Sequence, residues 1–404
     1  MIARRTLLLL GGLIVLSLAV GVAWWLGLLG TEALTAGPMV QSVGPHGFTV
    51  VWRTDERGES GLQLMDGDRA TLRVPARLQD GRYLATVRGL EPGRAYVYRV
   101  VIAQDGNTRV LGGPWSCKTD PGPGAAFQMA VFGDSGTGGR AQYRVARCIA
   151  ARPIDLIVHT GDLVYDRGEA ADYPDKFFEP YAEMLPSIPF MPVIGNHDYA
   201  TDRGRPLLDA FVLPRNGPAG TDPERHYWFD YGCARFAAID TDVDEAELRD
   251  RVAPWLVEVF ASAGGRWRFV YTHHPLYTGS TARGPSEPIQ RALAPAFDRA
   301  GVDVAFAGHN HLYERSKPIQ GGKVVGGGRG IVYVVTGAGG AKLRPTRPRA
   351  EWPDYVETAY DDDHSYTHVL VSPTSLALTQ INSAGETVDT WRLERKRTPT
   401  TNAP

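Results

Sequence analysis

Hydrophobic residues are distributed differently in successive parts of the chain, and the first part is a long apolar run. Residues 7–29 carry no charge and follow Arg4 and Arg5. A helix of about 20 apolar residues spans a bilayer core, whereas a cleaved signal peptide has an apolar core of about 7–15 residues. The length of the run, with Trp24 and Trp25 near its outer end, favours a signal anchor over residues 1–30. The arginines predict a cytoplasmic N-terminus and an extracytoplasmic body, which is secreted if the segment is cleaved.

The second part, residues 37–119, has the pattern of short antiparallel strands. Runs at 48–53, 83–87 and 95–100 are rich in β-branched and aromatic residues and are separated by glycine-containing turns. This spacing predicts an all-β sandwich. The segment 90–96 resembles the tyrosine corner of fibronectin type III domains, with Tyr96 as its tyrosine. The pattern predicts a platform or spacer domain.

After a turn-rich linker at 120–125, apolar runs alternate with helical segments as far as residue 393. Strands are predicted at 127–132, 154–158, 190–194, 269–272, 304–307, 331–336, 369–371 and 376–381, and helices at 141–151, 245–260 and 287–300. This alternation is typical of a layered α/β domain. Residues 394–404 form a tail.

The overall composition excludes several classes of protein. The formal net charge is −2 and the hydrophobic and charged fractions are 43% and 22%, as in an ordinary globular protein. No nucleic-acid binding is expected from that charge. Cys117, Cys148 and Cys233 form neither a CxxC pair nor a zinc-finger spacing.

Short motifs that carry chemical groups follow five of the predicted strands. They are Gly133-Asp134-Ser135-Gly136, Gly161-Asp162-Leu163-Val164-Tyr165, Gly195-Asn196-His197-Asp198, Val270-Tyr271-Thr272-His273-His274-Pro275 and Gly308-His309-Asn310-His311. Ligands of open α/β sheets bind at the carboxyl ends of strands. Oxygen and nitrogen donors without thiolate suit iron, manganese or zinc. The motifs together therefore predict a metal centre.

This ordered set resembles the five-block signature of purple acid phosphatases, within the calcineurin-like metallophosphoesterase superfamily. The resemblance covers roughly residues 127–393, and the preceding sandwich matches the two-domain plan of plant-type members. It implies an α/β metallophosphoesterase domain at 126–393, built as a β-sheet sandwich flanked by helices. It also implies two metal ions. Asp134, Tyr165 and His311 would hold the first ion, Asp162 would bridge both, and Asn196, His273 and His309 would hold the second.

Gly136 departs from the pattern of many metallophosphoesterases, which have a metal-binding histidine at that place. Tyr165 is placed to replace this ligand. A phenol has a free pKa of about 10, so it loses its proton near neutrality only beside a strongly charged ion. The sequence therefore predicts Fe(III) in the first position and a divalent ion (Fe, Zn or Mn) in the second.

The resemblance implies that small phosphate monoesters are hydrolysed by a metal-bound hydroxide, as in acid phosphatases. His197 would protonate or polarise the leaving oxygen. His274 either faces the substrate phosphate or supports the ligands from behind. Two alternatives remain: a phosphodiesterase on the same two metals, acting on a cyclic nucleotide or phospholipid head group, and a non-catalytic, membrane-held binding module. The oligomeric state is not predicted.

Overall fold

The computed structural model describes residues 33–280, 283–326 and 330–395. The predicted anchor at 1–30 and most of the tail lie outside this range. Among the described residues, no helix combines the length and the hydrophobicity needed to cross a bilayer.

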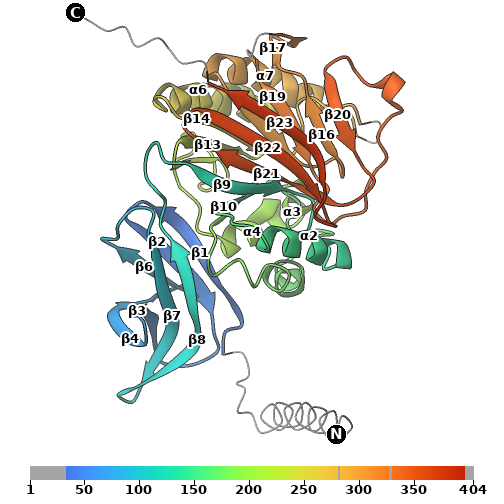
Figure 1. The fold of residues 1–404 in the computed structure, drawn as a ribbon. Helices are drawn as coiled ribbons and strands as arrows, with labels where there is room; N and C mark the ends of the chain where they lie inside the picture. Colours follow the sequence, from blue (N-terminus) through green and yellow to red (C-terminus); the bar gives the residue numbers. More distant parts are fainter. Residues whose placement is uncertain (1–32, 281–282, 327–329, 396–404) are drawn as a thin grey trace, which may run out of the picture.

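Two antiparallel sheets form the N-terminal domain, coloured blue to cyan in Figure 1. One sheet has the order β1-β2-β6-β5 and the other β4-β3-β7-β8. Inward-facing side chains such as Phe48, Trp52 and Tyr98 fill the space between the sheets. The backbone N–H of Glu91 donates to Tyr96 Oη over 2.9 Å, which is the contact expected of a tyrosine corner. The strands are β1 (Ala36–Gly44), β2 (Gly47–Arg53), β3 (Glu59–Asp66), β4 (Arg69–Pro75), β5 (Arg77–Gln79), β6 (Arg82–Arg88), β7 (Ala95–Gln104) and β8 (Asn107–Lys118).

The larger domain has two mixed sheets, ordered β11-β10-β9-β21-β22-β23 and β12-β13-β14-β15-β19-β16-β20. Their strands are β9 (Phe127–Phe132), β10 (Leu156–His159), β11 (Phe190–Pro192), β12 (Tyr227–Tyr231), β13 (Ala234–Ile239), β14 (Trp267–Thr272), β15 (Val304–Ala307), β16 (Tyr313–Ser316), β19 (Val332–Thr336), β20 (Val356–Tyr360), β21 (Ser365–Val371), β22 (Ser375–Asn382) and β23 (Thr387–Glu394). The small hairpin β17 (Ile319–Gln320) and β18 (Lys323–Val324) lies beside them.

The helices cover the outer faces of these sheets. The main ones are α2 (Arg140–Ala150), α6 (Ala253–Ala261) and α7 (Glu287–Ala300), and the short ones are α3 (Asn196–Tyr199), α4 (Arg205–Ala210) and α5 (Glu245–Glu247). Single helical turns occur at Ala170–Asp172, Pro174–Phe178, Asp202–Gly204, Leu248–Val252 and Arg349–Glu351.

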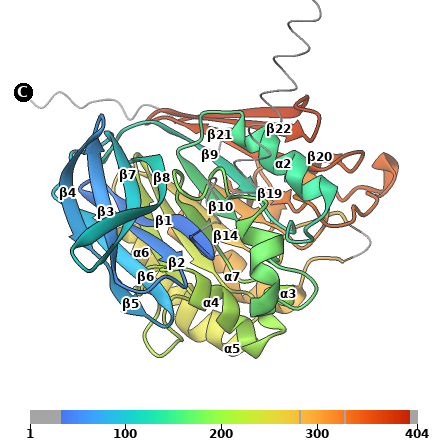
Figure 2. The ribbon, with the colours of Figure 1, turned by 90° about the horizontal axis from the view of Figure 1, so that it is seen from below.

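Successive side chains along each strand of the larger domain point to opposite faces of the sheet, and this explains the layered arrangement of the domain. On β14, Phe269 and Tyr271 belong to the core between the two sheets, whereas Val270 packs with α6 and α7. Each strand of this sheet therefore needs an apolar partner on both faces, and the order of layers is helix, sheet, sheet, helix. Figure 2 shows α2 and α7 on opposite sides of the sheets.

The two domains are in contact through buried polar groups. Tyr98 Oη donates to the carbonyl of Pro186 over 2.7 Å, and Arg82 Nη1 donates to the carbonyl of Phe211 over 2.7 Å. The linker is also tied down, because the Asp120 carboxylate accepts hydrogen bonds from Gly122 N and Gly232 N. The sandwich thus packs directly against the larger domain through specific hydrogen bonds.

The predicted helix at 245–260 is helical throughout, but it is not a regular α-helix. The segment consists of α5, a π-helical turn at Leu248–Val252 and then α6. Pro254 lies at the start of α6. The backbone is right-handed helical at both junctions, so the helix is continuous, and Pro254, which has no backbone N–H, lies just after the turn with irregular hydrogen bonding.

Candidate metal centre

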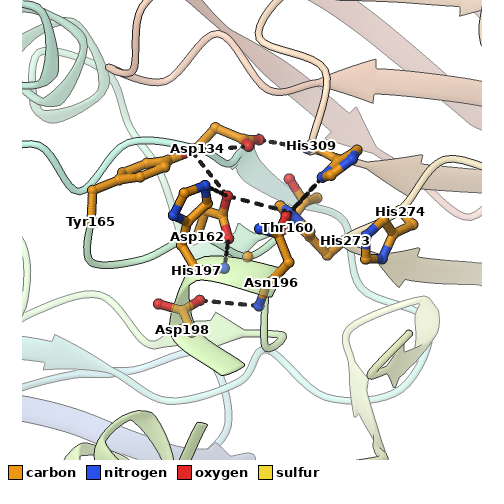
Figure 3. A network of polar contacts seen from close by, with 12 residues as sticks. Asp134, Thr160, Asp162, Tyr165, Asn196, His197, Asp198, His273, His274 and His309 are labelled. Carbon is orange, nitrogen blue, oxygen red and sulfur yellow. Dashed lines mark hydrogen bonds and ion pairs between the residues drawn. The ribbon is translucent and has the colours of Figure 1, made fainter. Parts of the chain in front are cut away.

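All seven predicted metal ligands lie at the carboxyl ends of parallel strands from the two sheets. Asp134 follows β9, Asp162 follows β10, Asn196 follows β11, His273 follows β14, and His309 and His311 follow β15. Tyr165 lies three residues beyond Asp162. Figure 3 shows most of these side chains turned toward one another across the edge of the sheets.

The backbone adopts an uncommon conformation at three of these positions. Asp134, Asp162 and His309 have φ values of 57°, 55° and 67°. Few non-glycine residues occupy this region, and such residues cluster at functional sites. Here the conformation is held by contacts between the motifs: Asp134 N donates to Gly161 O over 2.9 Å and His309 N donates to Asp134 Oδ2 over 2.8 Å.

Gly136 and Gly195 allow the loops to approach one another closely. A Cβ atom at Gly195 would lie 2.2 Å from Asp162 N, and one at Gly136 would lie 1.8 Å from the carbonyl oxygen of Leu163. No side chain therefore fits at Gly136. Instead its carbonyl accepts a hydrogen bond from Tyr165 N over 2.8 Å, which fixes the tyrosine beside the first group of ligands.

Around the phenol of Tyr165 the first group of donor atoms is compact. Tyr165 Oη lies 3.2 Å from Asp134 Oδ1, 3.0 Å from Asp162 Oδ2 and 3.2 Å from His311 Nε2. Donor atoms about 2.0–2.2 Å from one ion are separated from each other by about 3 Å. These four atoms therefore have the spacing of ligands to a single ion.

A second group of donor atoms lies on the other side of Asp162. Asn196 Oδ1 lies 3.1 Å from His273 Nε2 and 2.9 Å from His309 Nδ1, and these two nitrogens are 3.2 Å apart. His273 Nε2 is also 3.4 Å from Asp162 Oδ2. One carboxylate oxygen is thus adjacent to both groups, as a bridging ligand must be.

Backbone carbonyls decide which nitrogen of two histidines is available. His311 Nδ1 lies 2.7 Å from Lys342 O, and His273 Nδ1 lies 2.8 Å from Thr160 O. A carbonyl only accepts, so each Nδ1 carries a proton, and in the neutral ring each Nε2 then presents its lone pair to the centre. This is the arrangement of metal-binding histidines, in which the second nitrogen donates to an outer partner. The described residues therefore fit a pair of metal ions.

The charge on these groups is also suited to cations. Burial and the carboxylates of Asp134 and Asp162 raise the pKa of Tyr165 well above its usual range. Burial opposes the ionisation of Asp162, but the adjacent His273 outweighs it and lowers the pKa of Asp162. The centre thus concentrates carboxylates among largely buried side chains, and a phenolate forms there only beside a strong positive charge.

His197 lies beside the two groups and faces them with one nitrogen. Its Nδ1 is 2.5 Å from the carbonyl of Asp166, so this nitrogen carries a proton, and its Nε2 lies 4.0 Å from Asp162 Oδ2. The ring packs against that of Tyr165, with centroids 4.5 Å apart. Partial exposure leaves Nε2 accessible for exchange of a proton with a bound molecule.

His274 lies on the side of the second group. Its Nδ1 is 2.9 Å from Thr241 Oγ1 and its ring is 4.4 Å from that of His309. Burial and the charge of His273 lower the pKa of His274 to about 3. In this structure His274 therefore supports His309 as a neutral ring, and either of its predicted roles is compatible with that position.

Sequence reasoning missed three residues that shape the centre. Asp198 accepts hydrogen bonds from Leu163 N, Val164 N and Gly195 N and so joins the loops of Asp162 and Asn196. Thr241 holds His274, and Arg283 contacts His309. Only Asp198 stood in a recognised motif. Thr241 follows β13, whose alanine-rich sequence was not recognised as a strand, and Arg283 lies in a loop without a pattern.

The turn that carries Thr241 depends on a buried ion pair. Arg225 Nη1 lies 2.5 Å from Asp240 Oδ2, and the side chains of Arg225 and Asp240 are 6% and 0% exposed. Asp240→Ala should reduce the free energy of unfolding by about 3–5 kcal/mol, because it removes the close partner of a buried arginine and leaves only the longer 3.5 Å contact with the exposed Asp222. Urea unfolding measures the loss. Asp250→Ala breaks the exposed pair with Arg249 and should cost much less. Equal losses for both variants would contradict this account.

Comparison with known proteins identifies the protein family of this chain. Residues 127–313 match the calcineurin-like phosphoesterase family, and residues 330–390 match the iron/zinc purple acid phosphatase-like protein C family. The chain belongs to the calcineurin-like phosphoesterases and is a metal-dependent phosphoester hydrolase. The second match identifies it further as a purple acid phosphatase-like member, a group with an iron/zinc dinuclear centre.

Individual relatives agree with this placement. Acid phosphatase type 7 from Homo sapiens is 25% identical, over 84% of this chain and 85% of the relative. A protein named "Probable inactive purple acid phosphatase 24" from Arabidopsis thaliana is 25% identical over 76% of this chain, which spans just 57% of its length. The structure of a purple acid phosphatase from yellow lupin (Lupinus luteus) seeds superposes with a TM-score of 0.77 at 21% identity, covering 89% of this chain and 74% of that one. The lupin structure shows that the fold is shared.

Proposed function

We propose that this protein hydrolyses phosphate monoesters at a dinuclear centre of Fe(III) and a divalent ion (Fe, Zn or Mn). One observation carries the proposal: two compact groups of oxygen and nitrogen donors share the single atom Asp162 Oδ2. Asp134, Tyr165 and His311 would hold the first ion, and Asn196, His273 and His309 the second. When bound, two adjacent ions activate water and neutralise charge on the phosphoryl oxygens.

The protein's own residues would then handle the proton. His197 holds one proton on Nδ1 against the Asp166 carbonyl, so a second proton on Nε2 is the one that can be donated. That nitrogen faces the shared Asp162 oxygen from 4.0 Å. The leaving oxygen of a phosphate ester bound at the centre would lie on the side of Nε2. His197 thus acts as general acid toward the leaving group.

The relatives support this proposal unequally. The human protein is named an acid phosphatase, whereas the Arabidopsis protein is named as inactive. The proposal that this chain is active is therefore supported mainly by its own residues. Its seven predicted ligands are present, and the structure brings their donor atoms to within about 3 Å of each other in two groups.

Phosphate release tests the proposal. The full chain, purified in detergent and supplied separately with iron, manganese and zinc, is assayed with an aryl phosphate, a nucleoside monophosphate and a bis(aryl) phosphate diester. We expect turnover of the monoesters. Absence of turnover with every metal would refute the proposal, and a clear preference for the diester would establish the phosphodiesterase alternative.

Tyr165→Phe tests the first metal position. The substitution keeps the ring and its packing against His197 but removes the oxygen that lies near Asp134, Asp162 and His311. If the phenolate binds Fe(III), the wild-type protein shows a visible charge-transfer band and the variant loses it. The variant should also bind the first ion less tightly while its fold survives. Absorption spectra and metal analysis measure both effects. A variant that keeps the band would assign Tyr165 to packing alone.

A further inference from the structure

Arg283 directs a positive charge at the second group of ligands. Its Nη1 lies 3.0 Å from His309 Nδ1 and 3.4 Å from His309 Nε2. His309 Nδ1 is in turn 2.9 Å from Asn196 Oδ1. The guanidinium therefore lies beside the second group of donor atoms, against which a substrate phosphate would bind.

The backbone of this loop is held at both flanks. Asn310, between His309 and His311, donates from Nδ2 to the carbonyl of Arg283 over 3.1 Å. On the other flank, Gly279 N donates to the Glu314 carboxylate over 2.8 Å, and Arg347 Nε donates to Gly279 O over 2.7 Å. The motif that supplies the metal ligands thus also positions the main chain of Arg283.

Arg283 has no acidic partner in the described part of the chain. None of the ion pairs formed by Asp and Glu within residues 33–280, 283–326 and 330–395 includes it. Its contact with His309 joins a cation to a neutral ring, which does not neutralise it, and the guanidinium would leave His309 Nδ1 when that nitrogen holds a metal ion. A guanidinium at an anion-binding centre is free to bind an incoming anion, in the planar geometry suited to phosphate.

We propose that Arg283 binds the third terminal oxygen of the substrate's phosphoryl group and so determines the preference for monoesters over diesters. This inference rests on the proposed function. A phosphate monoester has three terminal oxygens and up to two negative charges. A diester has two terminal oxygens and one charge, because its third position is esterified. The two oxygens common to both classes are those available to the metals, and only a monoester offers a further charged oxygen to Arg283.

The experiment compares Arg283→Gln and Arg283→Lys with the wild type, using the metal-loaded full chain. The value of kcat/KM is measured for an aryl phosphate and for the corresponding bis(aryl) phosphate. The dissociation constant of inorganic phosphate is measured by calorimetry, and the metal content of each preparation is determined. Arg299→Gln, which removes the same charge from an exposed position on α7, is the matched control.

For Arg283→Gln we expect kcat/KM for the monoester to fall about 10–100-fold, the loss typical of a charge-assisted hydrogen bond. The diester should lose no more than about 5-fold, since it has one charge fewer to interact with the removed cation. Phosphate should bind about 10-fold more weakly or worse. Arg283→Lys should lie between Arg283→Gln and the wild type, and Arg299→Gln should match the wild type in every measurement.

Two results would overturn the inference: equal losses for monoester and diester, or unchanged phosphate affinity in Arg283→Gln. A drop in metal content of that variant would also overturn it, since Arg283 would then act through His309. If the wild type turns over neither ester, the proposed function fails. Calorimetry still decides whether Arg283 binds phosphate, so the two failures are distinguishable.

Discussion

Asp162→Asn is expected to abolish phosphate release, with a loss of kcat on the order of 10⁴-fold or more. Asp162 Oδ2 lies 3.0 Å from Tyr165 Oη in one group of ligands and 3.4 Å from His273 Nε2 in the other. An amide at this position has no charge, and when its nitrogen replaces Oδ2 it cannot act as a ligand. Both ions should therefore bind more weakly. Metal analysis after gel filtration and an assay with an aryl phosphate measure the two effects.

The fold should tolerate Asp162→Asn, because the change keeps the size of the side chain and removes one of several crowded negative charges. Circular dichroism and thermal unfolding provide the check. Asp209→Asn, at a partly exposed position paired with Arg205, is the control for a lost carboxylate and should behave as wild type. A well-folded Asp162→Asn protein with both metals bound and normal turnover would show that this carboxylate does not bridge the ions.

His197→Ala is expected to leave both metals bound and to slow the chemical step by about 10²–10⁴-fold, the usual contribution of a general acid. The structure separates this side chain from the ligands, because its Nδ1 is used by the Asp166 carbonyl and its Nε2 stands 4.0 Å from Asp162 Oδ2. The loss should be larger for an alkyl phosphate than for a nitrophenyl phosphate, whose leaving group needs little protonation. Steady-state kinetics with both esters measures the difference.

His46→Ala, in the sandwich domain, is the matched control for loss of a histidine and should not affect kinetics. If His197→Ala lost its metals, His197 would be a ligand and the general acid would have to be sought elsewhere. Equal losses for the alkyl and aryl esters would also contradict proton donation, leaving His197 a role in orienting Tyr165.

Much of the fold could be predicted because several of its strands are almost entirely apolar. The predicted strand at 127–132 corresponds to β9, and the one at 304–307 to β15. Strands with weaker patterns were missed. β13 contains three alanines among its six residues, and β20 lies on an edge of its sheet, where burial imposes little pattern. The anchor at 1–30 stays a prediction.

The residues of the candidate site also fall into those that could be predicted from the sequence and those that could not. The motifs around Asp134, Asp162 and His309 could be recognised because each combines a glycine with a metal-binding residue type at a strand end. Thr241 and Arg283 could not, because neither belongs to such a motif. They reach the site through tertiary contacts, with His274 and with His309 respectively.

The sequence by itself determined which chemical groups are available: carboxylates, imidazoles, an amide and a phenol, in an order that matches one enzyme class. Only the tertiary structure decided how they combine. Asp134 and His311 are 3.4 Å apart in space although 177 positions separate them in the chain, because two different sheets end at one edge. It also decided that Asp162 Oδ2 lies next to both groups of donor atoms, and that the carbonyls of Thr160 and Lys342 fix a proton on Nδ1 of His273 and His311. These properties depend on distances between donor atoms and on burial, which arise when the strands pack.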